Sequence, residues 1–112
     1  MNGTTDTRCE APLLSLEHAA QALESLGNPT RLGIFRLLVR AGAGGLPVGG
    51  VQQSLGIAPS TLTHHIAHLV QRGLVIQQRE GRVLRCLANY QQMAAVIDFL
   101  MAECCQGVSG CE

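Results

Sequence analysis

PVGGVQQSLGIAPSTLTHHIAHLV, residues Pro47–Val70, is the stretch of this chain that decides its fold. Its first part places three apolar residues at helical spacing and ends at Leu55, after which Gly56 turns the chain. Pro59 then opens a second helix, because its ring suits the first helical turn. Two short helices joined by a tight turn form a helix-turn-helix pattern.

The second helix of this stretch has an apolar stripe and a polar face. The stripe consists of Leu62, Ile66, Leu69 and Val70. The polar side chains expected to read DNA are Ser60, Thr61, Thr63, His64 and His68. Such hydrogen-bonding groups can contact base edges in the major groove. The alternative is an ordinary solvated face, but the turn and the arginines downstream favour groove contact.

Two runs of strand character, residues 74–79 and 82–87, follow the second helix and flank Glu80-Gly81. This spacing predicts a β-hairpin, which in this position is a wing. The arginines expected to hold the phosphate backbone are Arg72, Arg79, Arg82 and Arg85. Cys86 alternates with Arg85 and should face inward as a small core residue, so we do not assign it to a metal site.

The charge distribution agrees with phosphate binding. The chain has 8 basic and 8 acidic residues and a formal net charge of zero, but all the basic residues are arginine. Four of the arginines lie in residues 72–85 beside the single acid Glu80, which makes the centre of the chain basic. Nucleophile–base pairs and cofactor loops are absent from the sequence, so we expect neither an enzyme nor a catalytic cofactor. Without a membrane-spanning run or a signal-peptide core, we expect a cytoplasmic protein with no membrane partner.

The whole chain of 112 residues fits one domain. We expect a flexible N-terminal arm over residues 1–12, a winged helix-turn-helix domain over 13–105 and a tail over 106–112 that completes a cysteine site. The fold class is mainly α with a small β-hairpin wing. Ser15 and Asn28-Pro29 are predicted to start two helices before the helix-turn-helix.

The last helix is predicted from Tyr90 to about Glu103 and carries more apolar surface than a lone terminal helix should expose. The residues of this stripe are Met93, Val96, Ile97, Leu100 and Met101. We expect them to form a homodimer interface together with the first helix, which would present two recognition helices to a palindromic site. The alternative is packing within one subunit only.

Three of the five cysteines, Cys104, Cys105 and Cys111, lie in the last nine residues. Thiolates are preferred ligands of zinc, copper(I) and other soft ions, so this spacing predicts a soft-ion site. Alternatively, Cys104 and Cys105 extend the apolar stripe of the last helix by helical spacing. Cys111 lies beyond two glycines, in a tail with no packing role. Cys9 of the arm is a further candidate ligand.

Several motifs resemble those of one family. Ser60-x-x-Thr63-His64-His65-Ile66-x-x-Leu69-x-x-x-Gly73-Leu74-Val75, followed by Arg79-Glu80-Gly81-Arg82, is similar to the core signature of ArsR/SmtB-type winged-helix repressors, and LGNPTRL at 26–32 resembles the start of their second helix. The resemblance covers residues 16–105. It implies a homodimer that sits on operator double-stranded DNA and leaves it when a metal or metalloid binds. It also implies a packing role for His65.

The family that the chain resembles has several types of effector site, and the sequence can be compared with each. One arsenic site of the family needs cysteines in the stretch 46–51, which has none, and a zinc site needs histidines on the last helix, which has only Asp98 and Glu103. The C-terminal cysteines resemble those of arsenite-responsive repressors with two adjacent cysteines and a third shortly after. On that resemblance Cys104, Cys105 and Cys111 are expected to bind arsenite, with antimonite as a second candidate.

Other readings of the cysteines stay open. Cadmium, lead and bismuth also accept three sulfurs, and zinc would need a fourth ligand. A thiol redox sensor on the same fold would join Cys111 to Cys104 or Cys105. A metal-carrying protein with no DNA role is a further alternative. Neighbours on a helix point about 100° apart, so one ion can hold Cys104 and Cys105 only where the helix ends or unwinds. We expect that change to alter the angle between subunits and lower DNA affinity.

Overall fold

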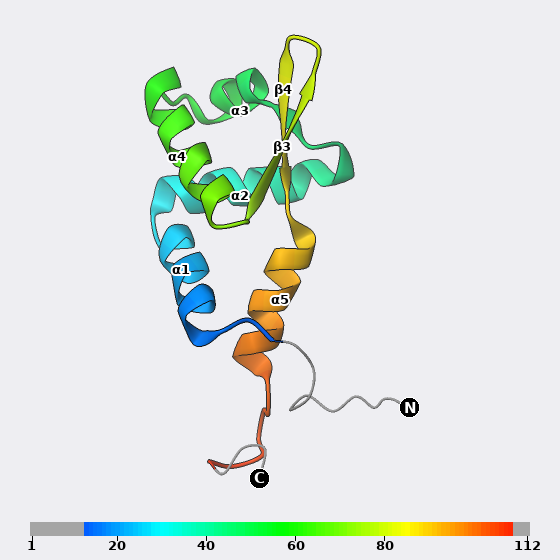
Figure 1. Ribbon diagram of the computed structural model, residues 1–112. Helices are drawn as coiled ribbons and strands as arrows, with labels where there is room; N and C mark the ends of the chain where they lie inside the picture. Colours follow the sequence, from blue (N-terminus) through cyan, green and yellow to red (C-terminus); the bar gives the residue numbers. More distant parts are fainter. Residues whose placement is uncertain (1–12, 109–112) are drawn as a thin grey trace.

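The computed structural model describes residues 13–108 of the chain (Figure 1). The elements are α1 (Leu16–Leu26), α2 (Pro29–Ala41), a short 3-10 turn η1 (Gly42–Gly44), β2 (Leu46–Pro47), α3 (Val48–Leu55), α4 (Pro59–Gln71), β3 (Val75–Glu80), β4 (Val83–Ala88) and α5 (Tyr90–Met101). This order confirms the predicted fold class: five helices with a hairpin wing after the helix-turn-helix.

Both predicted N-caps of the first two helices are confirmed. The Ser15 hydroxyl accepts a hydrogen bond from the His18 backbone N–H at 3.1 Å. The Asn28 carboxamide oxygen accepts bonds from the N–H groups of Thr30 at 2.9 Å and Arg31 at 3.1 Å. These bonds satisfy donors of the first helical turn that have no partner inside the helix, so each cap sets where its helix begins.

The sheet has a third strand that the sequence did not indicate. Its order is β2-β4-β3, and Leu46 pairs with Cys86 across the antiparallel β2–β4 ladder. Gly45 has a φ of +63°, and a Cβ at this position would overlap the Cys86 carbonyl oxygen. Only glycine therefore lets the chain come this close to β4. The hairpin turn lies one residue later than predicted, since Glu80 pairs with Val83.

The core is aliphatic, as the scarcity of aromatic residues predicts. Its fully buried large residues are Ile34, Leu38, Val51, Leu62, Leu69, Leu74 and Val96. Cys86 is 0% exposed, which confirms that it faces inward. Val70, predicted to be buried with the α4 stripe, is instead 36% exposed. Across residues 13–108 the structure has no helix with the length and apolar character needed to cross a membrane.

Helix α5 ends at Met101, about two residues before the predicted end. Beyond it, Glu103 and Cys105 have φ values of 61° and 67°, in the left-handed region. These backbone angles cannot belong to a continuing α-helix. Cys104 and Cys105 therefore do not extend the α5 stripe, and the helical spacing expected for them is wrong.

The described part of the chain is elongated, with principal extents of 51 × 28 × 20 Å. Figure 1 shows that the start of α4 and the tip of the β3–β4 hairpin lie at one end and that the end of α5 lies at the other. The predicted DNA surface and the predicted thiol site are therefore far apart.

Candidate functional site

The first half of α4 carries an exposed polar face. Its exposed hydrogen-bonding residues are Ser60, Thr61, Thr63 and His64. On the opposite side Leu62 and Ile66 are buried and hold the helix against the core. In helix-turn-helix proteins the start of the second helix lies in the major groove. This face therefore has the position and the chemistry needed to reach base edges.

A hollow of about 430 Å³ lies between the wing and the start of α3. Arg79 and Arg82 line it from the wing, and Val48 and Gly49 line it from α3. The N-cap residue of α3 is Pro47, which makes no side-chain capping bond, so α3 starts without a side-chain acceptor for its N–H groups. A helix N-terminus flanked by two arginines suits an anion. Neither arginine forms an ion pair with any residue in the described range, and the hollow can therefore receive a backbone phosphate.

His68 lies outside this surface, although the sequence placed it there. Its Nδ1 is 2.9 Å from the Ser25 hydroxyl oxygen and its Nε2 is 4.0 Å from a Glu24 carboxylate oxygen, both on α1. The cause is that α1 packs over the second half of α4, so the polar face of α4 is covered there. In this position His68 faces α1 and not the exposed face that was predicted to contact bases.

Two of the arginines predicted to contact phosphate instead contact other parts of the protein. Arg72 lies at the end of α4 beside α1 and α5, and its Nε is buried. Arg85 binds protein groups instead: its Nε donates to Glu80 of the wing at 3.0 Å, and its Nη1 donates to the Gly44 carbonyl of η1 at 3.1 Å. Arg85 therefore links the wing to η1, and of the four predicted arginines Arg79 and Arg82 line the hollow beside α3.

Arg31 is a structural residue that sequence reasoning missed. It is 9% exposed, and its Nε donates to the Ser25 carbonyl at 2.7 Å. One of its terminal nitrogens lies 3.4 Å from His65 Nδ1, and the other lies 3.9 Å from a Glu24 carboxylate oxygen. Arg31 thus connects α1, α2 and α4. Arg31 belongs to the LGNPTRL motif at 26–32, but nothing in the sequence indicates that an arginine in the first turn of a helix is buried.

His65 sits against Arg31 as a packing residue. Burial is the main cause that lowers its pKa, followed by the charge of Arg31 and then those of His64 and His68. The neutral imidazole is therefore the favoured form in the fold. The surroundings of His65 agree with the packing role that the family resemblance implies.

The thiols of Cys104 and Cys105 meet just beyond α5. Their Sγ atoms are 3.0 Å apart, and both residues are exposed. The hydrogen bond to Cys105 raises the pKa of the Cys104 thiol, since it stabilises the protonated form. Cys111 and Cys9 lie outside the described residues. Between residues 13 and 108 no three histidine, cysteine or acidic side chains gather to hold a metal ion.

The apolar stripe of α5 divides into a buried and an exposed part. Val96 is 1% exposed and Met93 packs against the core, so Val96 drops out of the predicted interface and Met93 is half-buried. The exposed members are Ile97, Leu100 and Met101, at 51%, 57% and 58%. Leu16 and Leu23 of α1 are also exposed. Both helices therefore leave apolar surface uncovered in a single subunit.

Comparisons with known proteins agree with this architecture. A family model described as a helix-turn-helix domain matches residues 26–78. The HTH-type transcriptional regulator YgaV of Escherichia coli (strain K12) is 32% identical over 76 residues, which cover 67% of this chain and 75% of YgaV.

Solved structures share the fold. HlyU from Vibrio cholerae N16961 is 28% identical with a TM-score of 0.64, covering 80% of this chain and 95% of that one. The transcriptional repressor BigR from Xylella fastidiosa is 26% identical with a TM-score of 0.62, covering 80% and 88%. An ArsR family transcriptional regulator, RHA00566, has a TM-score of 0.67 at 24% identity, covering 80% and 89%, and bears on the fold alone. The chain belongs to the family of helix-turn-helix transcriptional regulators that includes YgaV, whose members are DNA-binding proteins and not enzymes.

Proposed function

We propose that this protein is a repressor that binds operator DNA as a homodimer and dissociates when trivalent arsenic binds Cys104, Cys105 and Cys111, with antimonite as a second effector. The observation that carries the proposal is the exposed thiol pair, with Sγ atoms 3.0 Å apart at the end of α5. Two sulfurs at this separation are close enough to bind one soft ion. Cys111 follows after a tail short enough to supply the third sulfur at small entropic cost.

The chemistry of arsenite suits these thiols. One arsenite, As(OH)₃, exchanges its three hydroxyls for three thiols and releases three waters, with no net loss of protons. The raised pKa of Cys104 therefore does not oppose this exchange. Zinc or cadmium must instead displace the thiol protons, so their binding depends more strongly on pH than that of arsenite.

The operator would be read by the exposed face of α4 and held by the wing. Ser60, Thr61, Thr63 and His64 supply the groove contacts in this proposal, and Arg79 and Arg82 supply the phosphate contacts. Base contacts give sequence preference and phosphate contacts give affinity and register. The two sets therefore have different expected effects when they are removed.

The homodimer would form through the exposed apolar residues of α5 and α1. Ile97, Leu100 and Met101 give a continuous apolar strip on α5, and Leu16 lies on the neighbouring α1. A twofold interface built from these helices would set the distance between the two α4 helices. A change at this interface would thereby change the fit to DNA.

The thiol pair acts through that interface in the proposed mechanism. Because α5 already ends at Met101, arsenic does not need to unwind the helix to reach both sulfurs. Drawing Cys111 onto the pair instead closes the tail against the end of α5. A movement of α5 would be transmitted to α1, which packs against it. From α1 it would reach α4 through the contact between Ser25 and His68. An effector that favours one dimer geometry lowers affinity for DNA that needs the other.

Fluorescence anisotropy of the protein on its own promoter DNA tests the proposal. Arsenite should release the parent from DNA, whereas Cys104→Ser, Cys105→Ser and Cys111→Ser should stay bound at the same arsenite concentration. Cys86→Ala is the matched control, since it removes a buried thiol far from the pair and should still respond. The proposal would be contradicted if all three serine variants left the DNA at the arsenite concentration that releases the parent.

A thiol redox sensor is the second candidate, and the 3.0 Å contact between the two sulfurs favours it too. One HlyU structure, 26% identical to this chain with a TM-score of 0.60, is described as reduced. Peroxide would join Cys111 to Cys104 or Cys105, or these two to each other, in one disulfide and be reduced to two waters. Release by peroxide alone, reversed by dithiothreitol, would support it over the arsenite proposal.

A further inference from the structure

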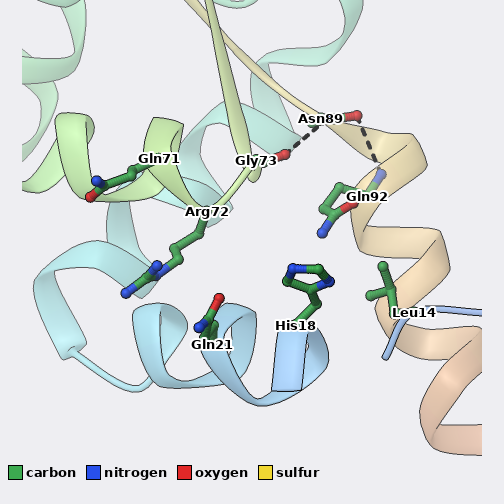
Figure 2. Close-up of a pocket in the computed structure, with 8 residues that line it drawn as sticks. All are labelled: Leu14, His18, Gln21, Gln71, Arg72, Gly73, Asn89 and Gln92. Carbon is green, nitrogen blue, oxygen red and sulfur yellow. Dashed lines mark hydrogen bonds between the residues drawn. The ribbon is translucent and has the colours of Figure 1, made fainter. Parts of the chain in front are cut away.

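A polar hollow of about 420 Å³ lies below the end of α4, away from both the proposed DNA surface and the thiol pair. Figure 2 shows His18 and Gln21 of α1 on one side of it and the Arg72 side chain extending from the end of α4 toward α1. Gln92 of α5 faces the His18 ring. The volume lies in the range of small-molecule sites, roughly 300–1,000 Å³. Its lining is mainly polar, which suits a small polar ligand.

The charge in the hollow is positive and unbalanced. Arg72 Nε is buried and has no hydrogen-bond partner within residues 13–108. A buried donor of this kind is unfavourable unless an acceptor reaches it. None of the residues that line the hollow is Asp or Glu. A carboxylate is the planar acceptor that a guanidinium binds best, because two parallel N–H groups can meet its two oxygens.

The frame around the hollow is held by hydrogen bonds. The Asn89 side-chain nitrogen donates to the Gly73 carbonyl at 2.8 Å, and the Asn89 backbone N–H donates to the Leu74 carbonyl at 2.9 Å. The Gln92 N–H in turn donates to the Asn89 side-chain oxygen at 3.3 Å. The turn after α4 is therefore tied to the start of α5 before any ligand arrives. A preformed frame of this kind lowers the ordering cost of binding.

We propose that this hollow binds a small organic anion with a carboxylate group, which pairs with Arg72 while His18, Gln21 and Gln92 bond its polar atoms. The ligand would touch α1, the end of α4 and α5 together. It would thus bias the orientation of the recognition helix relative to the helices of the proposed dimer. This second effector site is independent of the thiols and goes beyond the proposed response to arsenic.

Two-dimensional NMR of the full-length protein, in dithiothreitol and without arsenite, tests the site. The probes are succinate and lactate, each compared with its neutral amide, succinamide or lactamide. At least one of the acids should shift the amide signals of Gly73, Gln92 and His18 in a saturable way, and the amides should not. Arg72→Gln should weaken that binding by about tenfold or more, as expected for a lost charge-assisted bond. Arg40→Gln, which removes the same charge from an exposed part of α2, should bind like the parent.

Several results would overturn the proposal. These are equal shifts with acid and amide, equal affinities of Arg72→Gln and Arg40→Gln, or no saturable shift with any of the four probes. If Arg72→Gln does not fold, Gln21→Leu serves instead, and unchanged binding by that variant would count against the site. Operator affinity should change at saturating acid in the parent, and an unchanged affinity would remove the effector role.

Discussion

Replacing His68 by alanine should weaken the fold and leave the DNA surface intact. Ser25 is 0% exposed, and its hydroxyl lies 2.9 Å from His68 Nδ1. Truncating the histidine leaves a buried hydroxyl without that partner, a loss of about 1–3 kcal/mol. The contact with Glu24 adds little, because it spans 4.0 Å and the glutamate side chain is 64% exposed. A serine hydroxyl in a helix can also turn toward a carbonyl of the preceding turn, so we expect the lower half of that range.

Urea unfolding measures this loss, and a double-mutant cycle assigns it to the pair. His68→Ala should lower the unfolding midpoint without changing the slope of the transition. Ser25→Ala removes the hydroxyl itself, so adding His68→Ala to it should cost less than His68→Ala alone, with a coupling of about 1 kcal/mol. Simple additivity of the two changes would mean that the hydrogen bond does not contribute to stability.

His64→Ala is the matched comparison on the same helix. His64 is exposed, so its loss should change stability by no more than about 0.5 kcal/mol. If it contacts a base edge, operator affinity should fall by about 1–3 kcal/mol, measured by anisotropy against a scrambled duplex. Our assignment would be refuted if His68→Ala kept its urea midpoint and lost operator affinity as much as His64→Ala does.

Three further predictions concern the interface, the wing and the response to pH. Leu100→Glu should give a monomer in analytical ultracentrifugation with an unchanged fold, because Leu100 is 57% exposed in one subunit; a stable dimer would exclude this interface. Gly45→Ala and Gly42→Ala both put a side chain at positive φ, a strain of about 1–3 kcal/mol, but only Gly45 faces the Cys86 carbonyl. Gly45→Ala should therefore lower the free energy of unfolding in urea by about 1–3 kcal/mol more than Gly42→Ala does. Equal losses would contradict the close approach. Because the pKa of His65 is lowered in the fold, the unfolded chain binds more protons below about pH 6.5, so stability should be complete above that pH and fall below it. His65→Gln should flatten this decline in urea midpoints, and equal pH slopes would contradict it.

Local patterns in the sequence predicted most of the fold. Ser15 and Asn28 are caps because their short polar side chains match free N–H groups within three residues, which is a local property. Cys86 was placed in the core by strand alternation alone. The β2 strand was missed because Leu46–Pro47 is too short to show a period and owes its structure to its partner strand.

The functional surface was harder to predict, because helix periodicity says which residues share a face and not what covers that face. His64 and His68 are four residues apart on α4, yet one is exposed and the other meets α1. The sequence also did not show which arginines are covered by other elements. Arg79 stays exposed, whereas Arg31 of α2 is buried against Ser25 of α1 and His65 of α4, contacts that the pattern of α2 alone does not indicate.

The placement of the thiol pair beyond the last helix has an evolutionary consequence. The described residues after α5, 102–108, are not part of the buried core, so substitutions there carry little folding penalty. Selection could therefore alter the thiols of the proposed effector site, one residue at a time, while the residues that pack α4 against the core stay under their own constraints. If the proposed response resides in these thiols, the effector could change without a change in the fold, which would make the protein a suitable starting point for engineered biosensors with new inputs.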